Sequence, residues 1–139
     1  MSRGPRGECG SLSIEYVILV PVVFLVFALI YVFARMSEVS GVLDAGTRDA
    51  ARVASLAANA QQAHDLAVRT IRDELNGRSA TCDRTLRVDP ITGFGPGRTI
   101  TVRATCEYPI ADAGVPGAPG TLTVHSQFSA MIDPNRSLG

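Results

Sequence analysis

The sequence has few of the side chains on which enzymes and nucleic-acid-binding proteins depend. It contains no lysine and two histidines, and its thirteen basic and thirteen acidic side chains cancel. A balanced charge provides no basic surface that would attract nucleic acid. The glycine-rich segment 93–97 contains Pro96, which lacks an amide donor, and no Gly-Lys-Ser/Thr follows it, so it predicts a hairpin turn. We therefore expect no nucleic-acid partner and no phosphate-binding loop.

Motifs for catalysis and metal binding are also missing from the sequence. Gly-x-Ser-x-Gly does not occur, and the carboxylates are spread over predicted helices, where a solvated face is the simplest explanation. His64, His125, Cys82 and Cys106 have none of the close spacings of a zinc site. The sequence thus predicts neither an enzyme nor a cofactor or metal site.

A long apolar run near the N-terminus is the strongest signal in this chain, whose 139 residues are enough for one domain. Nineteen uncharged residues extend from Tyr16 to Ala34, between Glu15 and Arg35. At about 1.5 Å per residue, such a helix nearly covers the roughly 30 Å hydrocarbon core of a bilayer. We predict one transmembrane helix over residues 11–35. The alternatives are a buried core helix, which so small a chain could hardly surround, and a secretory signal peptide, for which the run is long.

A polar segment, residues 1–10, precedes the helix and ends in Gly10. A cut after Gly10 would leave the apolar helix on the mature chain and free the α-amine of Ser11, four residues before Glu15. Glycine suits a cleavage site because its unhindered backbone can lie extended in a protease cleft. The membrane edge would then hold the Glu15 anion and a cation, because an α-amine is mostly cationic at neutral pH. A carboxylate at this edge is costly unless it is paired, so Glu15 is a candidate functional residue. The alternative is that Glu15 only faces headgroups and water.

The same residues carry a resemblance to a known family. Gly10 followed by an acid at the fifth mature position resembles the class III signal of type IV prepilins, and the pair Glu15-Tyr16 is similar to that of tight-adherence (Flp/Tad) pilins. The string from Ser13 to Pro21, together with the Ala- and Arg-rich stretch 45–54, resembles TadE-like minor pilins or pseudopilins. The resemblance covers roughly residues 10–58.

The resemblance implies a function, partners and a location. The chain would be a minor pilin, pseudopilin or assembly factor, cut by a prepilin peptidase between Gly10 and Ser11, with Ser11, Glu15 and Tyr16 acting in assembly. Its partners would be that peptidase, other pilin or pseudopilin subunits and the lipid bilayer. It would be a single-pass protein with a cytoplasmic N-terminus and an extracytoplasmic C-terminal domain. The alternatives are a membrane-anchored binding domain that is never assembled and a secreted domain cut by signal peptidase.

Residues 36–76 predict a helical stem. Apolar residues recur at the helical period as far as Ala58, and Asn59 with Gln62 predicts a capping box for a second helix that ends near Asn76. Gly41 and Gly46 are small residues that would let another helix approach closely.

Residues 77–129 predict a small β ectodomain, and residues 130–139 a tail. The segments 85–89, 99–106 and 121–128 alternate apolar and polar residues, as in an antiparallel sheet with one face against a helix. Cys82 and Cys106 each fall at a strand-like segment and predict a disulfide, the alternative being two reduced thiols. The predicted fold class is α+β, pilin-like, with a membrane helix that continues into the stem.

Overall fold

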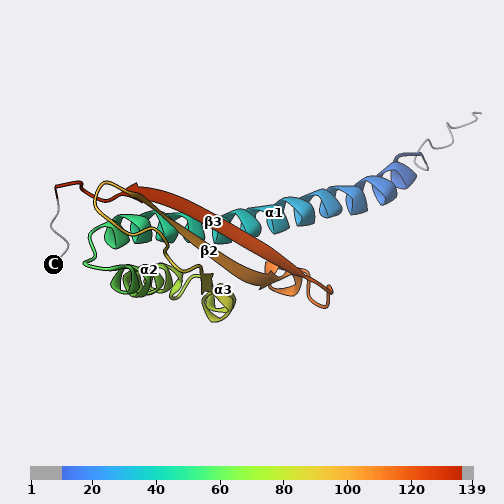
Figure 1. Cartoon of the computed structure of the whole chain (residues 1–139). Helices are drawn as coiled ribbons and strands as arrows, with labels where there is room; N and C mark the ends of the chain where they lie inside the picture. Colours follow the sequence, from blue (N-terminus) through green and yellow to red (C-terminus); the bar gives the residue numbers. More distant parts are fainter. Residues whose placement is uncertain (1–10, 136–139) are drawn as a thin grey trace, which may run out of the picture.

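The computed structural model describes residues 11–135, with side chains from residue 15 onward. The chain is α+β, as predicted, and one long helix carries a small domain at its C-terminal half (Figure 1). Its elements are α1 (Ser11–Ser55), α2 (Ala60–Leu75), α3 (Ala80–Thr85), β1 (Arg87–Val88), β2 (Thr99–Pro109), the 3-10 helix η1 (Ile110–Ala113) and β3 (Thr121–Met131).

Helix α1 joins the predicted membrane helix and stem without a break over 45 residues. Pro21 lies inside it, where it removes one backbone donor near the start of the helix. The first half of α1 projects away from the rest of the chain, whereas the second half lies against α2 and the sheet (Figure 1). The helix ends at Ser55, slightly before the predicted Ala58.

The three strands form one antiparallel sheet in the order β1-β2-β3. In the register of β2 and β3, Val102 lies opposite Phe128. Alternate residues of β2 are fully or almost fully buried, because this face of the sheet covers α1: Ile100, Val102, Ala104 and Cys106. The predicted apolar face of the sheet is therefore confirmed.

The core fills the space between the sheet, α1 and α2. Its largest fully buried apolar side chains come from all of these elements and from the segment after β3: Leu43, Ile71, Leu75, Ile100, Val102 and Ile132. Thr47 is also fully buried on α1, and its hydroxyl donates to Leu43 O at 2.7 Å, which satisfies its donor inside the core.

The start of α2 follows the predicted capping pattern with one difference. The Asn59 side chain accepts a hydrogen bond from Gln62 N at 2.9 Å, as expected for the N-cap. The Gln62 side chain accepts from Ala58 N at 3.0 Å, one residue before the amide that a standard capping box uses. The helix ends at Leu75, and Asn76 is its C-cap, as predicted.

The prediction of strand-like structure around Cys82 and over 85–89 is wrong for most of these residues. Cys82 lies in the short helix α3, and only Arg87 and Val88 form a strand. Helix α3 begins where Ser79 Oγ accepts from Cys82 N at 3.4 Å, a local cap that competes with extended structure. Thr85 instead meets β2 through its side chain: its hydroxyl donates to Glu107 O at 2.9 Å and accepts from Glu107 N at 3.0 Å.

The prediction that a tail begins at residue 130 is also wrong. Strand β3 continues to Met131, where its neighbour on β2 is Thr99. Ile132 is fully buried, and its amide donates to Arg98 O at 2.9 Å while its carbonyl accepts from Gly97 N at 3.1 Å. An apolar side chain in the core thus keeps this segment ordered beyond the last strand pair.

Candidate membrane and assembly site

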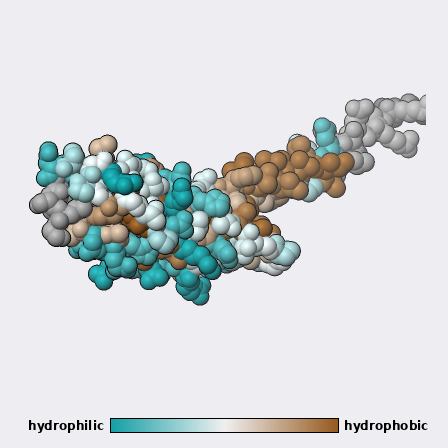
Figure 2. Space-filling model, in the orientation of Figure 1, coloured by the Kyte–Doolittle hydropathy of each residue, from teal (hydrophilic) through white to brown (hydrophobic). Residues whose placement is uncertain are grey.

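The first half of α1 exposes an apolar surface that is unusual for a protein in water. From Glu15 to Tyr31 every side chain is exposed, and Phe24, for example, is 71% accessible. In Figure 2 this half is covered by hydrophobic residues, whereas the domain at the other end is mostly hydrophilic. So large an exposed apolar patch marks contact with lipid or protein. Helix α1 is long and apolar enough to cross a membrane once.

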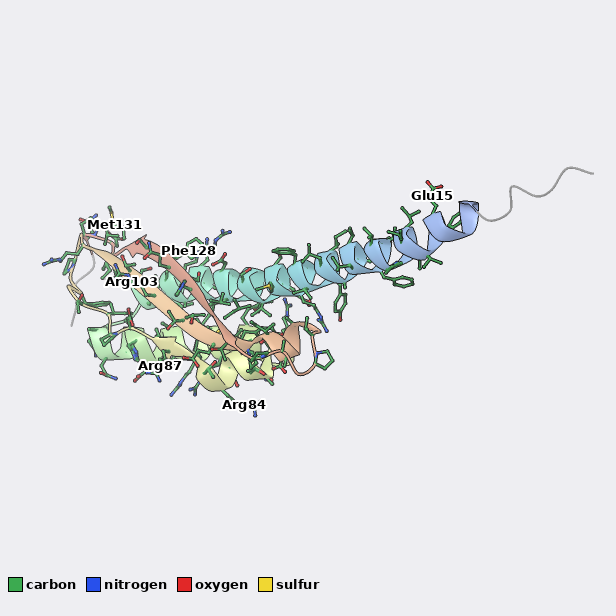
Figure 3. The ribbon with its side chains drawn as sticks, turned by 90° about the vertical axis from the view of Figure 1, so that its right-hand side faces the viewer. Glu15, Arg84, Arg87, Arg103, Phe128 and Met131 are labelled. Atoms are coloured by element: carbon green, nitrogen blue, oxygen red, sulfur yellow. A yellow bond between two sulfur atoms is a disulfide. The ribbon has the colours of Figure 1, made fainter. Side chains whose placement is uncertain are left out.

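Charged side chains mark the two ends of this segment. Glu15 lies near the start of α1, far from the domain (Figure 3). Arg35 follows twenty residues later, a distance of about 30 Å along a helix. Arg35 Nη1 lies 3.0 Å from Glu38 Oε2, an ion pair between exposed side chains on the domain side. The charges therefore delimit a segment that matches the hydrocarbon core in length.

The predicted processing and assembly residues are only partly within the described structure. Gly10 lies outside the described residues. Ser11 is the first residue of α1, and its side chain is not described. Glu15 and Tyr16 are exposed, and all ion pairs found among residues 15–135 lie at Arg35 or beyond. Glu15 thus lies exposed four residues after Ser11.

Cys82 and Cys106 form a disulfide in the structure. Their Cα atoms lie 5.1 Å apart, and both side chains are almost completely buried. The bond joins α3 to β2, which is the strand that pairs with both others. The two residues are 24 positions apart along the chain, and the loop that the bond closes contains β1.

A contact that the sequence did not reveal lies between the β2–β3 connection and α1. Gly114 follows η1 with a φ of +104°, and a Cβ placed on it would lie 2.6 Å from Tyr31 Cε1. Tyr31 belongs to the apolar segment of α1. No local sequence pattern joins residues so far apart in the chain, although a glycine in a Gly- and Pro-rich connection is typical of a tight turn.

Tyr108, near the end of β2, bonds the start of the same connection. Its hydroxyl donates to Asp112 O at 2.8 Å. Burial raises the pKa of the Tyr108 phenol, and the charge of the Asp112 carboxylate raises it further, whereas the Arg35 guanidinium opposes the shift. Tyr108 thus ties the end of β2 to η1, at the start of the β2–β3 connection.

The histidines and acidic residues do not form a reactive cluster in the part of the chain that the structure describes. His64 Nε2 lies 3.2 Å from Val88 O, a contact that joins α2 to β1. His125 is exposed on β3. Among residues 15–135, no three His, Cys, Asp or Glu side chains come together in a way that could hold a metal ion.

An exposed apolar helix that continues into a stem and a small α+β domain defines a class of protein, the single-pass membrane-anchored proteins with one small domain. More particularly, residues 10–52 match the family model described as TadE-like protein. The matched region ends three residues before α1 does. Neither the curated proteins nor the solved structures include a match to this chain. Over residues 10–52, which hold the apolar segment and the first part of the stem, the chain is therefore similar to TadE-like proteins, which indicates a pilus-related membrane protein.

Proposed function

We propose that this chain is a minor pilin, pseudopilin or assembly factor of a tight-adherence type pilus, processed by a prepilin peptidase after Gly10. One observation carries this proposal. The TadE-like match begins at Gly10 and covers almost all of α1, so it includes the proposed cleavage site, the exposed apolar segment and the first part of the stem. The proposal requires no catalytic step by this chain.

Removal of residues 1–10 would create a positive charge that can pair with the Glu15 carboxylate. The freed α-amine of Ser11 has an ordinary pKa of about 7.7–8.0, so it is mostly cationic at neutral pH. At the membrane edge an unpaired Glu15 carboxylate is costly, and a cationic partner would relieve that cost. We place this partner on a neighbouring subunit, whose Ser11 amine would face Glu15 when two α1 helices lie side by side in the membrane.

Lateral packing of α1 would provide the remaining contacts. The apolar side chains from Tyr16 to Ile30 are exposed, since the domain packs against the second half of the helix and reaches the apolar segment at Tyr31. The same surface can therefore contact lipid before assembly and other subunits afterwards. The proposed partners are other pilin or pseudopilin subunits, with Glu15 and the Ser11 amine fixing how far one helix is displaced along the next.

The proposed topology has a cytoplasmic N-terminus and an extracytoplasmic domain. The Cys82–Cys106 disulfide supports this orientation, because disulfides form and persist in oxidising compartments outside the cytoplasm. Cleavage after Gly10 at the cytoplasmic face would then leave the helix in the membrane, as a prepilin peptidase requires and a signal peptidase does not.

The proposed pairing predicts the behaviour of a Glu15→Gln variant. This change removes the charge and preserves the shape, so we expect the variant to be cut after Gly10 but to be recovered poorly with the other pilus subunits. Hydrogen bonds to charged groups contribute about 1.5–3 kcal/mol, which corresponds to at least about tenfold weaker association. The measurement is co-purification of the variant with pilus components from cells that contain the whole system.

Asp44→Asn is the matched control, because Asp44 is an exposed carboxylate on the same helix beyond the apolar segment. It should co-purify like the unmodified chain. Equal recovery of Glu15→Gln and Asp44→Asn would contradict the proposed pairing. Failure to cut either chain would instead argue against the prepilin-type cleavage.

A further inference from the structure

We propose that residues 114–120, here called the membrane-side loop, rest in the headgroup region of the same bilayer that α1 crosses. The loop follows η1 and connects it to β3. This inference rests on the proposed membrane insertion of α1 and adds a second point of contact with lipid. Figure 1 shows the connection between β2 and β3 at the end of the sheet that points along α1 toward its N-terminal half.

The depth of the loop follows from its contact with Tyr31. Gly114 approaches the Tyr31 ring so closely that a Cβ there would lie 2.6 Å from Cε1. Tyr31 precedes Arg35 by four residues, which places it about 6 Å deeper along the helix than the first charge of the domain side. If Arg35 lies at the bilayer surface, Gly114 is already at the level of the headgroups. Tyrosine is itself enriched at that level.

The composition of the loop fits an interfacial position. Residues 113–122 contain no charged side chain. Val115 is 41% exposed, and Pro116 and Pro119 are exposed beside it. The nearest charge, Asp112, is turned toward α3, because its carboxylate accepts a hydrogen bond from Thr81 Oγ1 at 2.8 Å. Transfer of an exposed apolar side chain from water into the interfacial region lowers the free energy, and this loop has no charged side chain to oppose it.

Hydrogen bonds give the loop a fixed shape, so that it can act as a support. Ala118 N donates to Val115 O at 3.1 Å, which closes a turn with Val115 near its start. Ile110 N donates to Gly120 O at 3.1 Å, which holds the two ends of the connection together. These backbone bonds spare the loop part of the cost of burying unpaired amides near the membrane.

Contact at two points would fix the inclination of the domain on the membrane. The α1 helix alone allows the domain to swing about the point where the helix leaves the bilayer. A loop that rests on the lipid beside the helix restricts this motion, because the sheet connects the loop rigidly to the stem. The exposed Met131, by contrast, lies at the opposite end of the domain (Figure 3), far from the apolar half of α1.

The absence of tryptophan from the sequence permits a direct test, because each substitution introduces the only tryptophan of the chain. The full chain is reconstituted into phosphatidylcholine vesicles as Val115→Trp, Met131→Trp or Phe24→Trp. Emission is recorded with unmodified lipid and with lipid brominated either near the headgroup end or near the terminus of the acyl chain. Bromine quenches tryptophan only at short range, so quenching reports contact with lipid at that depth.

We expect Val115→Trp to be quenched most by bromine near the headgroups, several-fold more than Met131→Trp, whose tryptophan remains in water. Phe24→Trp, in the middle of the span, should be quenched most by bromine near the chain terminus. Pro116→Trp should behave like Val115→Trp, so the result does not depend on one substitution.

The loop contact and the membrane span can be contradicted separately. Quenching of Phe24→Trp without quenching of Val115→Trp and Pro116→Trp overturns the loop inference and leaves the membrane span intact. A blue-shifted but unquenched emission at Val115→Trp also overturns it, because the loop would then be covered by protein. Absence of quenching at Phe24→Trp would overturn the membrane span itself.

Discussion

Single residues fix the position of the sheet on α1 at its membrane-side end. Gly114 has a positive φ, which other L-residues adopt only at a cost, and its missing side chain leaves room for the Tyr31 ring. In β2, which precedes this connection, the Tyr108 hydroxyl donates a hydrogen bond to the backbone carbonyl of Asp112. The two residues together shape the connection that lies nearest to the apolar half of α1.

Tyr108→Phe tests the contribution of this hydrogen bond. We expect the free energy of unfolding to fall by about 0.5–1.5 kcal/mol at neutral pH, the usual contribution of one hydrogen bond. Urea unfolding of the full chain in detergent micelles, followed by circular dichroism, measures this difference.

The difference in the free energy of unfolding between the unmodified chain and Tyr108→Phe should shrink as the pH rises above about 10. Because folding raises the pKa of the phenol, its contribution is fully present below the unfolded value of about 10 and is lost as the pH rises through the folded value. The chain has no lysine, and arginine stays charged, so few other groups titrate in this range. A difference that stays constant or widens above pH 10 would contradict the assignment.

At the scale of elements, α1 and α2 approach each other through one of the two glycines of the stem. A Cβ on Gly46 would lie 3.3 Å from Glu74 Cβ and 3.4 Å from Ile71 Cα, so α2 packs directly on the backbone of α1. Gly41 has no atom within 4 Å of such a Cβ among the described residues. The predicted close approach is therefore confirmed at Gly46, whereas Gly41 serves no such contact inside the chain.

These two glycines form a matched pair for substitution by leucine. Gly46→Leu forces α2 away from α1, and we expect it to lower the free energy of unfolding by about 1–3 kcal/mol, as overpacking of a core does. Gly41→Leu should leave stability unchanged or raise it by up to about 1 kcal/mol, because leucine favours helix more than glycine does. Denaturant unfolding of both variants in micelles measures the changes, and equal effects would contradict the packing described.

The elements that could be predicted from sequence are those that local patterns determine. The apolar run, the stem period and the Asn59 cap all lie within short windows, and the structure confirms them. Helix α3 could not be predicted in the same way. The alternation of 85–89 is typical of a strand, but Thr85 bonds β2 through its hydroxyl, a contact over 22 residues that no local pattern encodes.

The end of β3 shows the same limit. The predicted tail covers residues 130–139, yet β3 continues to Met131 and Ile132 is buried in the core among side chains from elements far away in sequence. In the candidate site, the apolar segment and its bounding charges could be read from the sequence, whereas the contact of Gly114 with Tyr31 depends on how the sheet lies on the helix.

At the scale of the whole molecule, one continuous helix serves two environments. Its first half is apolar on every side and exposed, and its second half is amphipathic and forms one wall of the domain core. Because no break separates the halves, a displacement of the helix in the membrane is transmitted to the domain. The family match covers this shared helix, and α2 and the sheet lie beyond it.

The start of the mature chain is the feature on which the proposed assembly depends. Without a cut after Gly10 there is no Ser11 amine to face Glu15, and α1 would be an ordinary anchor. The N-terminal sequence of the protein extracted from membranes of its native host tests this directly. We predict a chain that begins at Ser11; a chain that begins at Met1 or Ser2, or at Arg35 after release by signal peptidase, would contradict the account.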